Sequence, residues 1–243
     1  MKTAIITGAS KGIGAKTAIC LAMQGYNIAV NYLNSKKAAY DIVEKITSLG
    51  AKALAFKADV SQRSQVDEMV LSVKKEFGKI DLLVNNAGIA QQKLFTDITS
   101  EDWDKMVGTN LTGVFNCTQA VLKDMIRQKS GNIINVSSIW GITGGSCEVH
   151  YSAVKAGIIG LTKALAKEVG PCGINVNCVA PGVILTDMNA NLDEQTLLSL
   201  KEETPLNRIG TTDDIANAIC FLASDNAKFI TGQVLSPNGG IIT

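Results

Sequence analysis

Three side chains in the second half of the sequence have the types and spacing for proton transfer to a substrate oxygen. Tyr151 and Lys155, in YSAVK, are four residues apart and share one face of a helix. A nearby ammonium group lowers the pKa of a phenol, which can then exchange a proton with an alcohol or ketone near neutral pH. Ser138 would hydrogen-bond the same oxygen. The Tyr-Lys pair alone is weak evidence, because most such pairs are surface contacts on helices.

A glycine-rich stretch near the N-terminus, TGASKGIG at residues 7–14, has the composition of a phosphate-binding turn. Gly8, Gly12 and Gly14 follow an apolar run and precede an amphipathic segment. Glycines in a strand-to-helix turn let the backbone approach a pyrophosphate, which the positive end of the helix attracts. The alternative is a glycine-rich turn without a ligand, but the placement favours a bound dinucleotide and therefore hydride transfer.

The residues after the second predicted strand indicate which dinucleotide is bound. An NAD site usually has Asp or Glu about 20 residues beyond the glycines, where it accepts hydrogen bonds from ribose hydroxyls. No acidic residue precedes Asp41, and the turn and strand end instead carry cationic and polar side chains: Lys11, Asn34, Ser35, Lys36 and Lys37. Such groups bind a 2′-phosphate. We therefore predict NADP(H), although Lys36 or Lys37 would equally suit a solvated helix start.

Alternating strand-like and helix-like segments would position these residues. Apolar runs predict strands at 2–7, 26–32, 51–60, 79–88, 131–139, 173–182 and 232–240, and amphipathic segments predict helices at 12–24, 35–49, 63–77, 100–128, 151–169, 190–203 and 212–223. The runs are apolar along their length, as expected when both sheet faces are covered. The pattern predicts the α/β class, as a single doubly wound Rossmann-type domain over residues 1–243 with about seven parallel strands flanked by helices. Ser138 would then lie at the ligand-binding edge of the sheet.

Charge and cysteine content narrow the function classes. The 23 basic and 22 acidic side chains give a net charge of +1, which argues against a nucleic-acid partner. Six cysteines without C-x-x-C spacing and a single histidine predict no metal site, and they suggest reduced thiols in a cytoplasmic protein. No secretory signal and no apolar run of about 18 residues is evident, so no membrane span is expected.

Taken together, the motifs resemble those of the short-chain dehydrogenase/reductase family. TGASKGIG is similar to its TGxxxGIG turn, and NNAG at 85–88 to its NNAG element. NVSS is similar to its catalytic-serine strand, YSAVK to its YxxxK motif, and APGVILTDM to its PG-x-x-x-T stretch. The resemblance extends from Lys2 to about Gly240 and therefore covers almost the whole chain.

The resemblance implies a role for each matching residue. Tyr151 would be the general acid in ketone reduction, Lys155 would lower its pKa and hold the nicotinamide ribose, and Ser138 would orient the carbonyl. Asn110 would hold a water that links Lys155 to solvent. Asp59 would contact the adenine. The implied cofactor-binding residues are Gly8, Ser10, Lys11, Gly12, Ile13, Gly14, Asn31, Asn34, Ser35, Asp59, Val60, Asn86, Ala87, Gly88, Tyr151, Lys155, Pro181, Gly182, Ile184 and Thr186.

Within that family the chain resembles bacterial 3-oxoacyl-[acyl-carrier-protein] reductases, through VNY, GVFNCTQA, GLTKALAKE and ITGQVLSPNGG. This resemblance implies an NADPH-dependent reductase of a keto group in fatty acid biosynthesis, with a thioester on an acyl carrier protein as substrate. Cys172 stands where that group often has an arginine that faces the acidic carrier protein. Arg127 and Lys129 remain as expected carrier contacts, or as ordinary surface charge.

The stretch SIWGITGGSCEVHYSAVK predicts an alternative substrate. SIWG and SCEV resemble a Gram-positive reductase of 5-aminopentanone attached to a lysine of elongation factor P. Glu148, three residues before Tyr151, would suit a cationic amine better than an acyl chain, unless it points outward or caps the helix. His150 is expected to line the substrate pocket at most. Sugar or steroid alcohols, and a non-catalytic NADP(H)-sensing protein, are further alternatives, although sensing proteins of this fold commonly lose the tyrosine or lysine.

The resemblance also implies features outside the site. A lid is expected at about residues 186–204. Large apolar faces on the predicted helices at 100–128 and 151–169 are expected to pack across a two-fold axis, and the last strand across another, in a homotetramer or a dimer.

Overall fold

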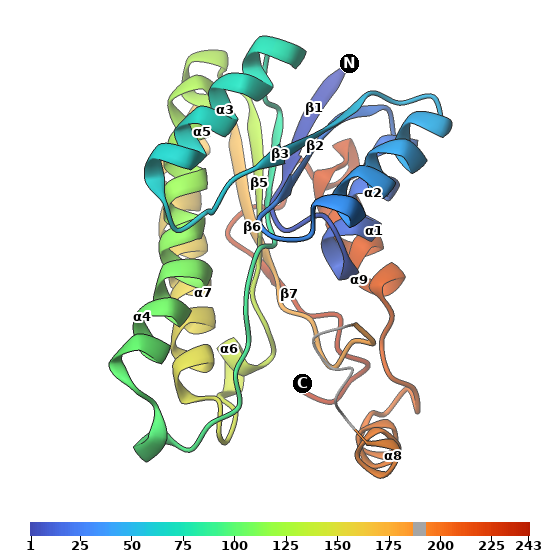
Figure 1. Ribbon diagram of the computed structural model, residues 1–243, viewed down its shortest axis with the longest axis vertical. Helices are drawn as coiled ribbons and strands as arrows, with labels where there is room; N and C mark the ends of the chain where they lie inside the picture. Colours follow the sequence, from blue (N-terminus) through green and yellow to red (C-terminus); the bar gives the residue numbers. More distant parts are fainter. Residues whose placement is uncertain (187–192) are drawn as a thin grey trace.

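A parallel β-sheet forms the centre of the molecule (Figure 1). The computed structural model of the chain describes residues 1–186 and 193–243. Its strands are β1 (Lys2–Ile6), β2 (Tyr26–Tyr32), β3 (Ala53–Lys57), β4 (Leu82–Asn85), β5 (Gly131–Val136), β6 (Ile174–Val179) and β7 (Val234–Leu235). They pair in the order β3-β2-β1-β4-β5-β6-β7, and every pair is parallel. The predicted doubly wound sheet of seven parallel strands is confirmed.

Helices cover both faces of this sheet, as the apolar strands require. They are α1 (Gly12–Met23), α2 (Lys36–Ser48), α3 (Arg63–Phe77), α4 (Ser100–Val107), α5 (Gly113–Gln128), α6 (Trp140–Thr143), α7 (Val149–Val169), α8 (Glu194–Glu203) and α9 (Thr212–Ala223). Figure 1 shows α1, α2 and α9 on one face and α3, α5 and α7 on the other. Each layer buries its own apolar cluster against the sheet. Strand β2, which lies between β3 and β1, is consequently buried along its whole length.

The structure differs from the predicted elements in a few places. The predicted helix at 100–128 is two α-helices joined by a π-helical segment, Gly108–Thr112. The short helix α6 was not predicted, and α7 begins at Val149, two residues before the expected start. Part of the expected lid, residues 187–192, lies outside the described residues, whereas α8 forms within the remainder.

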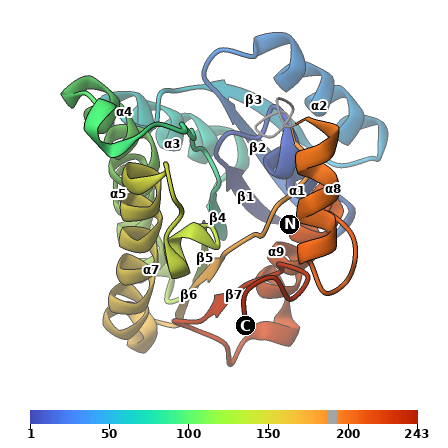
Figure 2. The ribbon, with the colours of Figure 1, turned by 90° about the horizontal axis from the view of Figure 1, so that it is seen from below.

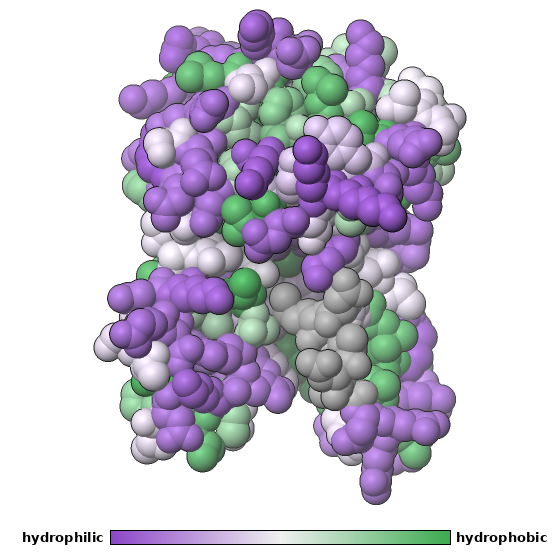
Figure 3. Space-filling view, viewed as in Figure 1, coloured by the Kyte–Doolittle hydropathy of each residue, from purple (hydrophilic) through white to green (hydrophobic). Residues whose placement is uncertain are grey.

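The strand order reverses direction between β1 and β4. The chain passes from β1 outward to β2 and β3, and then returns to β4 on the other side of β1. The carboxyl ends of β1 and β4 therefore border a crevice, which is where doubly wound sheets bind ligands. Figure 2 views the molecule from this end, and in Figure 3 the surface below the sheet divides into a lobe that carries α4 and another that carries α8.

Candidate active site

The turn between β1 and α1 has the backbone geometry that its glycines make possible. Gly8 and Gly12 have φ values of +62° and +59°, in the left-handed region that side chains disfavour. A Cβ atom on Gly14 would lie 2.5 Å from the carbonyl oxygen of Gly8, so only glycine lets α1 approach the turn this closely. The N-cap residue of α1, Lys11, makes no capping hydrogen bond through its side chain to the first turn of that helix. Its backbone N–H groups are therefore oriented to bind an anion.

Thr7 joins this turn to the end of β4. Its Oγ1 accepts hydrogen bonds from the backbone N–H groups of Asn86 and Ala87, both at 2.9 Å. The Asn86 side chain donates in return to the carbonyl oxygens of Thr7 and Gly8, at 2.9 and 3.2 Å. The functional importance of Thr7 was missed in the sequence, although its place just before Gly8 was a signal. The contacts fix the NNAG segment beside the glycine turn.

A cavity of about 380 Å³ lies over this turn. It is lined by Gly8, Ser10, Lys11, Gly12, Ile13, Asn31, Tyr32, Leu33, Asn34, Ser35, Ala58, Asp59, Val60, Asn86, Ala87, Gly88, Ile89, Thr109 and Thr186. The predicted residues of the adenosine side are thus brought together, and Tyr32, Leu33, Ala58, Ile89 and Thr109 were missed in the sequence. Gly14 lies behind the turn, where it supports Gly8 instead of lining the cavity.

Two of the polar residues in this cavity also have structural partners. Asn31 is buried, accepts a hydrogen bond from the backbone N–H of Gly8 at 3.1 Å and donates to the carbonyl oxygen of Ala58 at 3.0 Å. Asp59 accepts hydrogen bonds from the backbone and hydroxyl of Ser61 at 2.9 and 2.8 Å. Each side chain therefore helps to hold the wall in place as well as facing the cavity.

The charges in this cavity fit a phosphorylated dinucleotide. Asp59 is its only acidic residue in the described parts of the chain, and it comes after β3 instead of β2. The end of β2 presents Asn34 and Ser35, with Lys11 nearby in the glycine turn. These residues suit a 2′-phosphate and lack the carboxylate that would repel it. When bound, a nicotinamide dinucleotide supplies or accepts the hydride.

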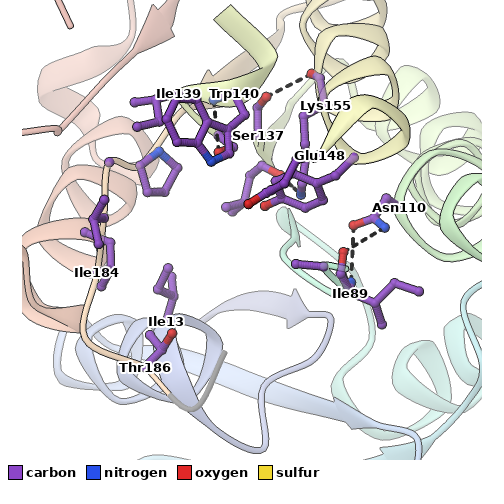
Figure 4. Close-up of a pocket in the computed structure, with 18 of the residues that line it drawn as sticks. Ile13, Ile89, Asn110, Ser137, Ile139, Trp140, Glu148, Lys155, Ile184 and Thr186 are labelled. Atoms are coloured by element: carbon purple, nitrogen blue, oxygen red, sulfur yellow. Dashed lines mark hydrogen bonds between the residues drawn. The ribbon is translucent and has the colours of Figure 1, made fainter. Parts of the chain in front are cut away.

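A second cavity, of about 320 Å³, adjoins the first. Ile13, Asn86, Gly88, Ile89 and Thr186 line both cavities, so one extended ligand can occupy the two. The four predicted catalytic residues, Asn110, Ser138, Tyr151 and Lys155, all line this second cavity, together with the predicted Pro181, Gly182 and Ile184. Figure 4 shows Asn110, Lys155 and Ile184 around it. The structure therefore brings these predicted proton-transfer residues to a cavity that adjoins the predicted cofactor site.

Lys155 is buried directly beside Tyr151. Its Nζ lies 5.5 Å from the centre of the Tyr151 ring and donates a hydrogen bond to the carbonyl oxygen of Val136 at 2.9 Å. Burial lowers the pKa of Lys155 to about 8, against a smaller opposing effect of Cys178. The lysine therefore loses its charge much more readily than one at the surface.

The pKa of Tyr151 moves opposite to the sequence-based expectation. Burial raises it to about 12, a hydrogen bond with Ser138 lowers it, and the nearby Glu148 raises it further. The expected net fall in the Tyr151 pKa is wrong for the chain alone, because the desolvation of a buried phenolate outweighs the attraction of the ammonium group. Tyr151 is thus protonated at neutral pH, which is the form that a proton donor needs.

Asn110 owes its position to the π-helical segment that interrupts the α4–α5 helix. It is fully buried, and its Nδ2 donates to the carbonyl oxygens of Ile89 and Met106, both at 3.1 Å. A Cβ atom on Gly88 would meet Asn110 Oδ1 at 2.7 Å and Lys155 Nζ at 3.6 Å. Glycine at position 88 therefore lets the strand end pass close to both side chains.

Glu148 faces the second cavity from the N-cap position of α7. Its side chain makes no capping hydrogen bond, and its Oε1 instead accepts one from Gln92 Nε2 at 3.3 Å. Burial raises the pKa of this carboxyl group, while the Gln92 hydrogen bond lowers it. The capping and outward-pointing alternatives are therefore wrong.

His150 does not line the substrate cavity, so that prediction is wrong. The helix places Glu148, Tyr151 and Lys155 on one face at intervals of three and four residues, and His150 is turned away from that face. Its imidazole is fully buried and forms a 2.9 Å hydrogen bond between Nε2 and Gln91 Oε1.

The expected carrier contacts lie far from this site within one copy of the chain. Arg127 and Lys129 are at the end of α5, just before β5, whereas Ser138 follows the opposite end of β5. Arg127 pairs with Asp124 on its own helix at 3.1 Å.

Two general features complete the description of the site's surroundings. Within residues 1–186 and 193–243, no group of three or more His, Cys, Asp or Glu side chains is arranged to hold a metal ion. In the same ranges, no helix combines the length and apolar character needed to span a bilayer.

Comparison with known proteins agrees with this geometry. A family model described as enoyl-(acyl carrier protein) reductase matches residues 8–242. The 3-oxoacyl-[acyl-carrier-protein] reductase FabG of Staphylococcus epidermidis is 48% identical over 240 residues, which cover 99% of this chain and 98% of that protein. The Staphylococcus aureus FabG is 47% identical with the same coverage, and the 3-oxoacyl-[acyl-carrier-protein] reductase of Synechocystis is 45% identical over 99% of this chain and 97% of its own. The chain belongs to the short-chain dehydrogenase/reductase family.

Proposed function

We propose that the protein is an NADPH-dependent reductase of a keto group, acting on a 3-oxoacyl thioester carried by an acyl carrier protein. The observation that carries this proposal is the convergence of Ser138, Tyr151 and Lys155 on a cavity that adjoins the glycine-turn cavity. The names of the relatives support the choice of a 3-oxoacyl thioester as substrate. The absence of a carboxylate at the end of β2 supports the choice of NADPH over NADH.

Each of the four predicted catalytic side chains has its own role in the proposed ketone reduction. Ser138 donates its hydroxyl hydrogen to the ketone oxygen and orients it toward Tyr151. The phenol of Tyr151, protonated at neutral pH, donates the proton that converts the developing alkoxide into an alcohol. The Lys155 ammonium group stabilises the phenolate that remains and holds the ribose. Asn110 would hold a water through which the proton returns from solvent.

A panel of substrates tests the proposed reaction. NADPH oxidation is followed with acetoacetyl thioester, crotonyl thioester, a sugar ketone, a steroid ketone and an amine-bearing ketone. We expect turnover of the acetoacetyl thioester and none of the crotonyl thioester, because Tyr151 and Ser138 are placed to protonate an oxygen. Consumption of the crotonyl thioester alone would contradict the proposal and favour the activity in the family model's description.

The position of Glu148 favours a second candidate function. A partly buried carboxylate beside Tyr151 offers a counter-charge to an ammonium group, and the indole of Trp140 lines the same cavity (Figure 4). An acyl chain supplies no positive charge, so Glu148 would keep its hydrogen bond from Gln92 but lack a counter-charge, and burying such a carboxylate is unfavourable. The second candidate is therefore the reduction of an amine-bearing ketone, such as 5-aminopentanone on a lysine of elongation factor P.

The substitution Glu148→Gln separates the two candidates. It should lower kcat/KM for an amine-bearing ketone by about tenfold, while the acetoacetyl thioester is reduced at least as well as before. Glu202→Gln, at an exposed position on α8, is the matched control. Equal turnover of the amine-bearing ketone by Glu148→Gln and the wild type would refute the amine-binding role.

We further infer a homotetramer in the cytoplasm. Phe115 on α5 is 48% exposed, and Phe229, just before β7, is fully exposed, so one copy leaves aromatic side chains uncovered on two separate surfaces. All six cysteines are unpaired, in keeping with a reducing compartment. Light scattering on the purified protein distinguishes a tetramer from a dimer.

A further inference from the structure

The buried His150 belongs to a chain of hydrogen bonds that ends at a carboxylate. Gln91 Nε2 donates to Asp102 Oδ1 at 2.9 Å, and Gln91 Oε1 lies 2.9 Å from His150 Nε2. An ionised carboxylate only accepts hydrogen bonds, so the amide nitrogen of Gln91 must face Asp102 and the amide oxygen must face the imidazole. His150 Nε2 therefore carries the proton, and the ring is held as a single tautomer.

Asp102, at the end of this series of hydrogen bonds, is itself held in place by several contacts. Its Oδ2 accepts hydrogen bonds from Lys93 Nζ at 2.6 Å and from the backbone N–H of Thr99 at 3.1 Å. Thr99 and Asp102 form a capping box at the start of α4. Hydrogen bonds from Lys93, Gln91 and Thr99 hold the pKa of Asp102 well below its usual range. The carboxylate is therefore charged and fixed at any pH near neutrality.

The two residues after Gln91 contact the region at the start of α7 at two further points. Gln92 donates to Glu148 at 3.3 Å, and the backbone N–H of Lys93 donates to the carbonyl oxygen of Cys147 at 2.7 Å. Cys147 has a φ of +60°, which a non-glycine residue adopts only when its surroundings impose it. Each of residues 91–93 therefore forms a hydrogen bond with a residue of the segment 147–150.

The segment of residues 89–93 also forms part of the wall of the second cavity. Ile89, Ala90 and Gln92 line the cavity from one side, and Glu148 and Tyr151 line it from α7. Gln91 and His150 lie behind the wall and do not line the cavity. His150 Nδ1 is buried and has no hydrogen-bond partner among the described residues. A leucine would fill this space without the unpaired Nδ1, but it would remove the hydrogen bond to Gln91, so that bond is what the imidazole adds beyond packing.

We propose that His150 is a positioning residue: the Asp102–Gln91–His150 chain fixes residues 89–93 against the start of α7 and so sets the cavity wall at the correct distance from Tyr151. This role rests on the proposed ketone reduction. Small displacements of a bound substrate from a proton donor are costly, because proton transfer depends on a short distance between donor and acceptor. Of residues 89–93, Ile89 alone also lines the cofactor cavity over the glycine turn, so cofactor binding should change far less than ketone reduction.

Nuclear magnetic resonance tests the tautomer without any substrate. His150 is the only histidine in the chain, so tag-free protein labelled with ¹⁵N shows one imidazole in long-range ¹H–¹⁵N spectra. We expect a proton on Nε2, and a change in the imidazole signals in Gln91→Leu. A ring protonated at Nδ1, or one that is unaffected by Gln91→Leu, would overturn the proposal.

Matched variants test the positioning role. His150→Gln keeps an N–H donor that reaches Gln91, whereas His150→Leu does not. We expect His150→Leu to lower kcat/KM for the ketone by about tenfold or more and His150→Gln to recover most of the loss, with the Kd for NADPH unchanged in both. Gln91→Leu should reproduce the loss, and adding it to His150→Leu should cause no further loss.

Backbone hydrogen exchange separates failure of this role from failure of the reaction itself. Exchange at residues 88–94 should quicken in His150→Leu but not in His150→Gln, whether or not a substrate is known. If the wild type reduces no ketone, the proposed function fails, and the exchange data and the tautomer still decide whether the segment is fixed as described. If the wild type is active and His150→Leu matches it, or His150→Gln is no better than His150→Leu, the positioning role is refuted.

Discussion

Lys155 should set the pH dependence of ketone reduction. Burial lowers its pKa to about 8, and only the charged form both donates to Val136 and stabilises a phenolate at Tyr151. A group with this pKa is roughly 90% charged at pH 7 and roughly 10% charged at pH 9, so kcat/KM should fall about tenfold between these values. Tyr151 does not cause this fall, because its pKa of about 12 keeps it protonated throughout.

The assay is the initial rate of NADPH oxidation between pH 6 and pH 10, at constant ionic strength and saturating NADPH. The Kd for NADPH is measured by fluorescence at each pH as a control, so that weaker cofactor binding is not mistaken for a slower reaction. A profile that stays flat to pH 10, or that falls only near the ordinary lysine pKa of 10.5, would refute the reasoning.

Two other substitutions have expected outcomes. Lys155→Met should abolish reduction yet raise the free energy of unfolding at pH 7. The lowering of the Lys155 pKa from 10.5 to about 8 means that its buried charge destabilises the folded protein by about 3 kcal/mol. Removing the charge recovers this free energy, less the contribution of the lost hydrogen bond to Val136. The unfolded chain binds more protons than the folded one between about pH 8 and 10.5, so wild-type stability should rise with pH in that window, and urea unfolding of both proteins measures these effects. Gly14→Ala should cost about 1–3 kcal/mol and weaken NADPH binding, because its Cβ would lie 2.5 Å from the Gly8 carbonyl oxygen. Gly170→Ala is the matched control, because a Cβ there meets nothing within 4 Å, and similar losses in the two variants would contradict the steric explanation.

The sequence predicts the sheet well because its signals are local. Each buried strand is a mostly apolar run, and Gly8, Gly12 and Gly14 mark the turn that the cofactor site requires. The spacing of Tyr151 and Lys155 fixes their common helical face whatever the rest of the fold. These features depend on residues that are near one another in the chain.

The wrong and missed predictions depend on contacts between distant segments. The pKa of Tyr151 was expected to fall, but its direction depends on how deeply the surrounding elements bury the phenol. His150 was assigned to the substrate pocket by its proximity in sequence, whereas its environment is set by Gln91, 59 residues away. Local sequence does not reveal the role of Thr7, because the partners of its hydroxyl group come from the segment just after β4.

The most direct test of the central claim is the reduction of an acetoacetyl thioester by NADPH in the wild type and in Tyr151→Phe. The phenylalanine removes only the hydroxyl group that is placed to donate the proton. We predict that kcat falls by about 10²- to 10⁴-fold while the Kd for NADPH stays within a factor of two. A Tyr151→Phe enzyme that reduces the thioester at the wild-type rate would contradict the assignment of Tyr151 as the proton donor.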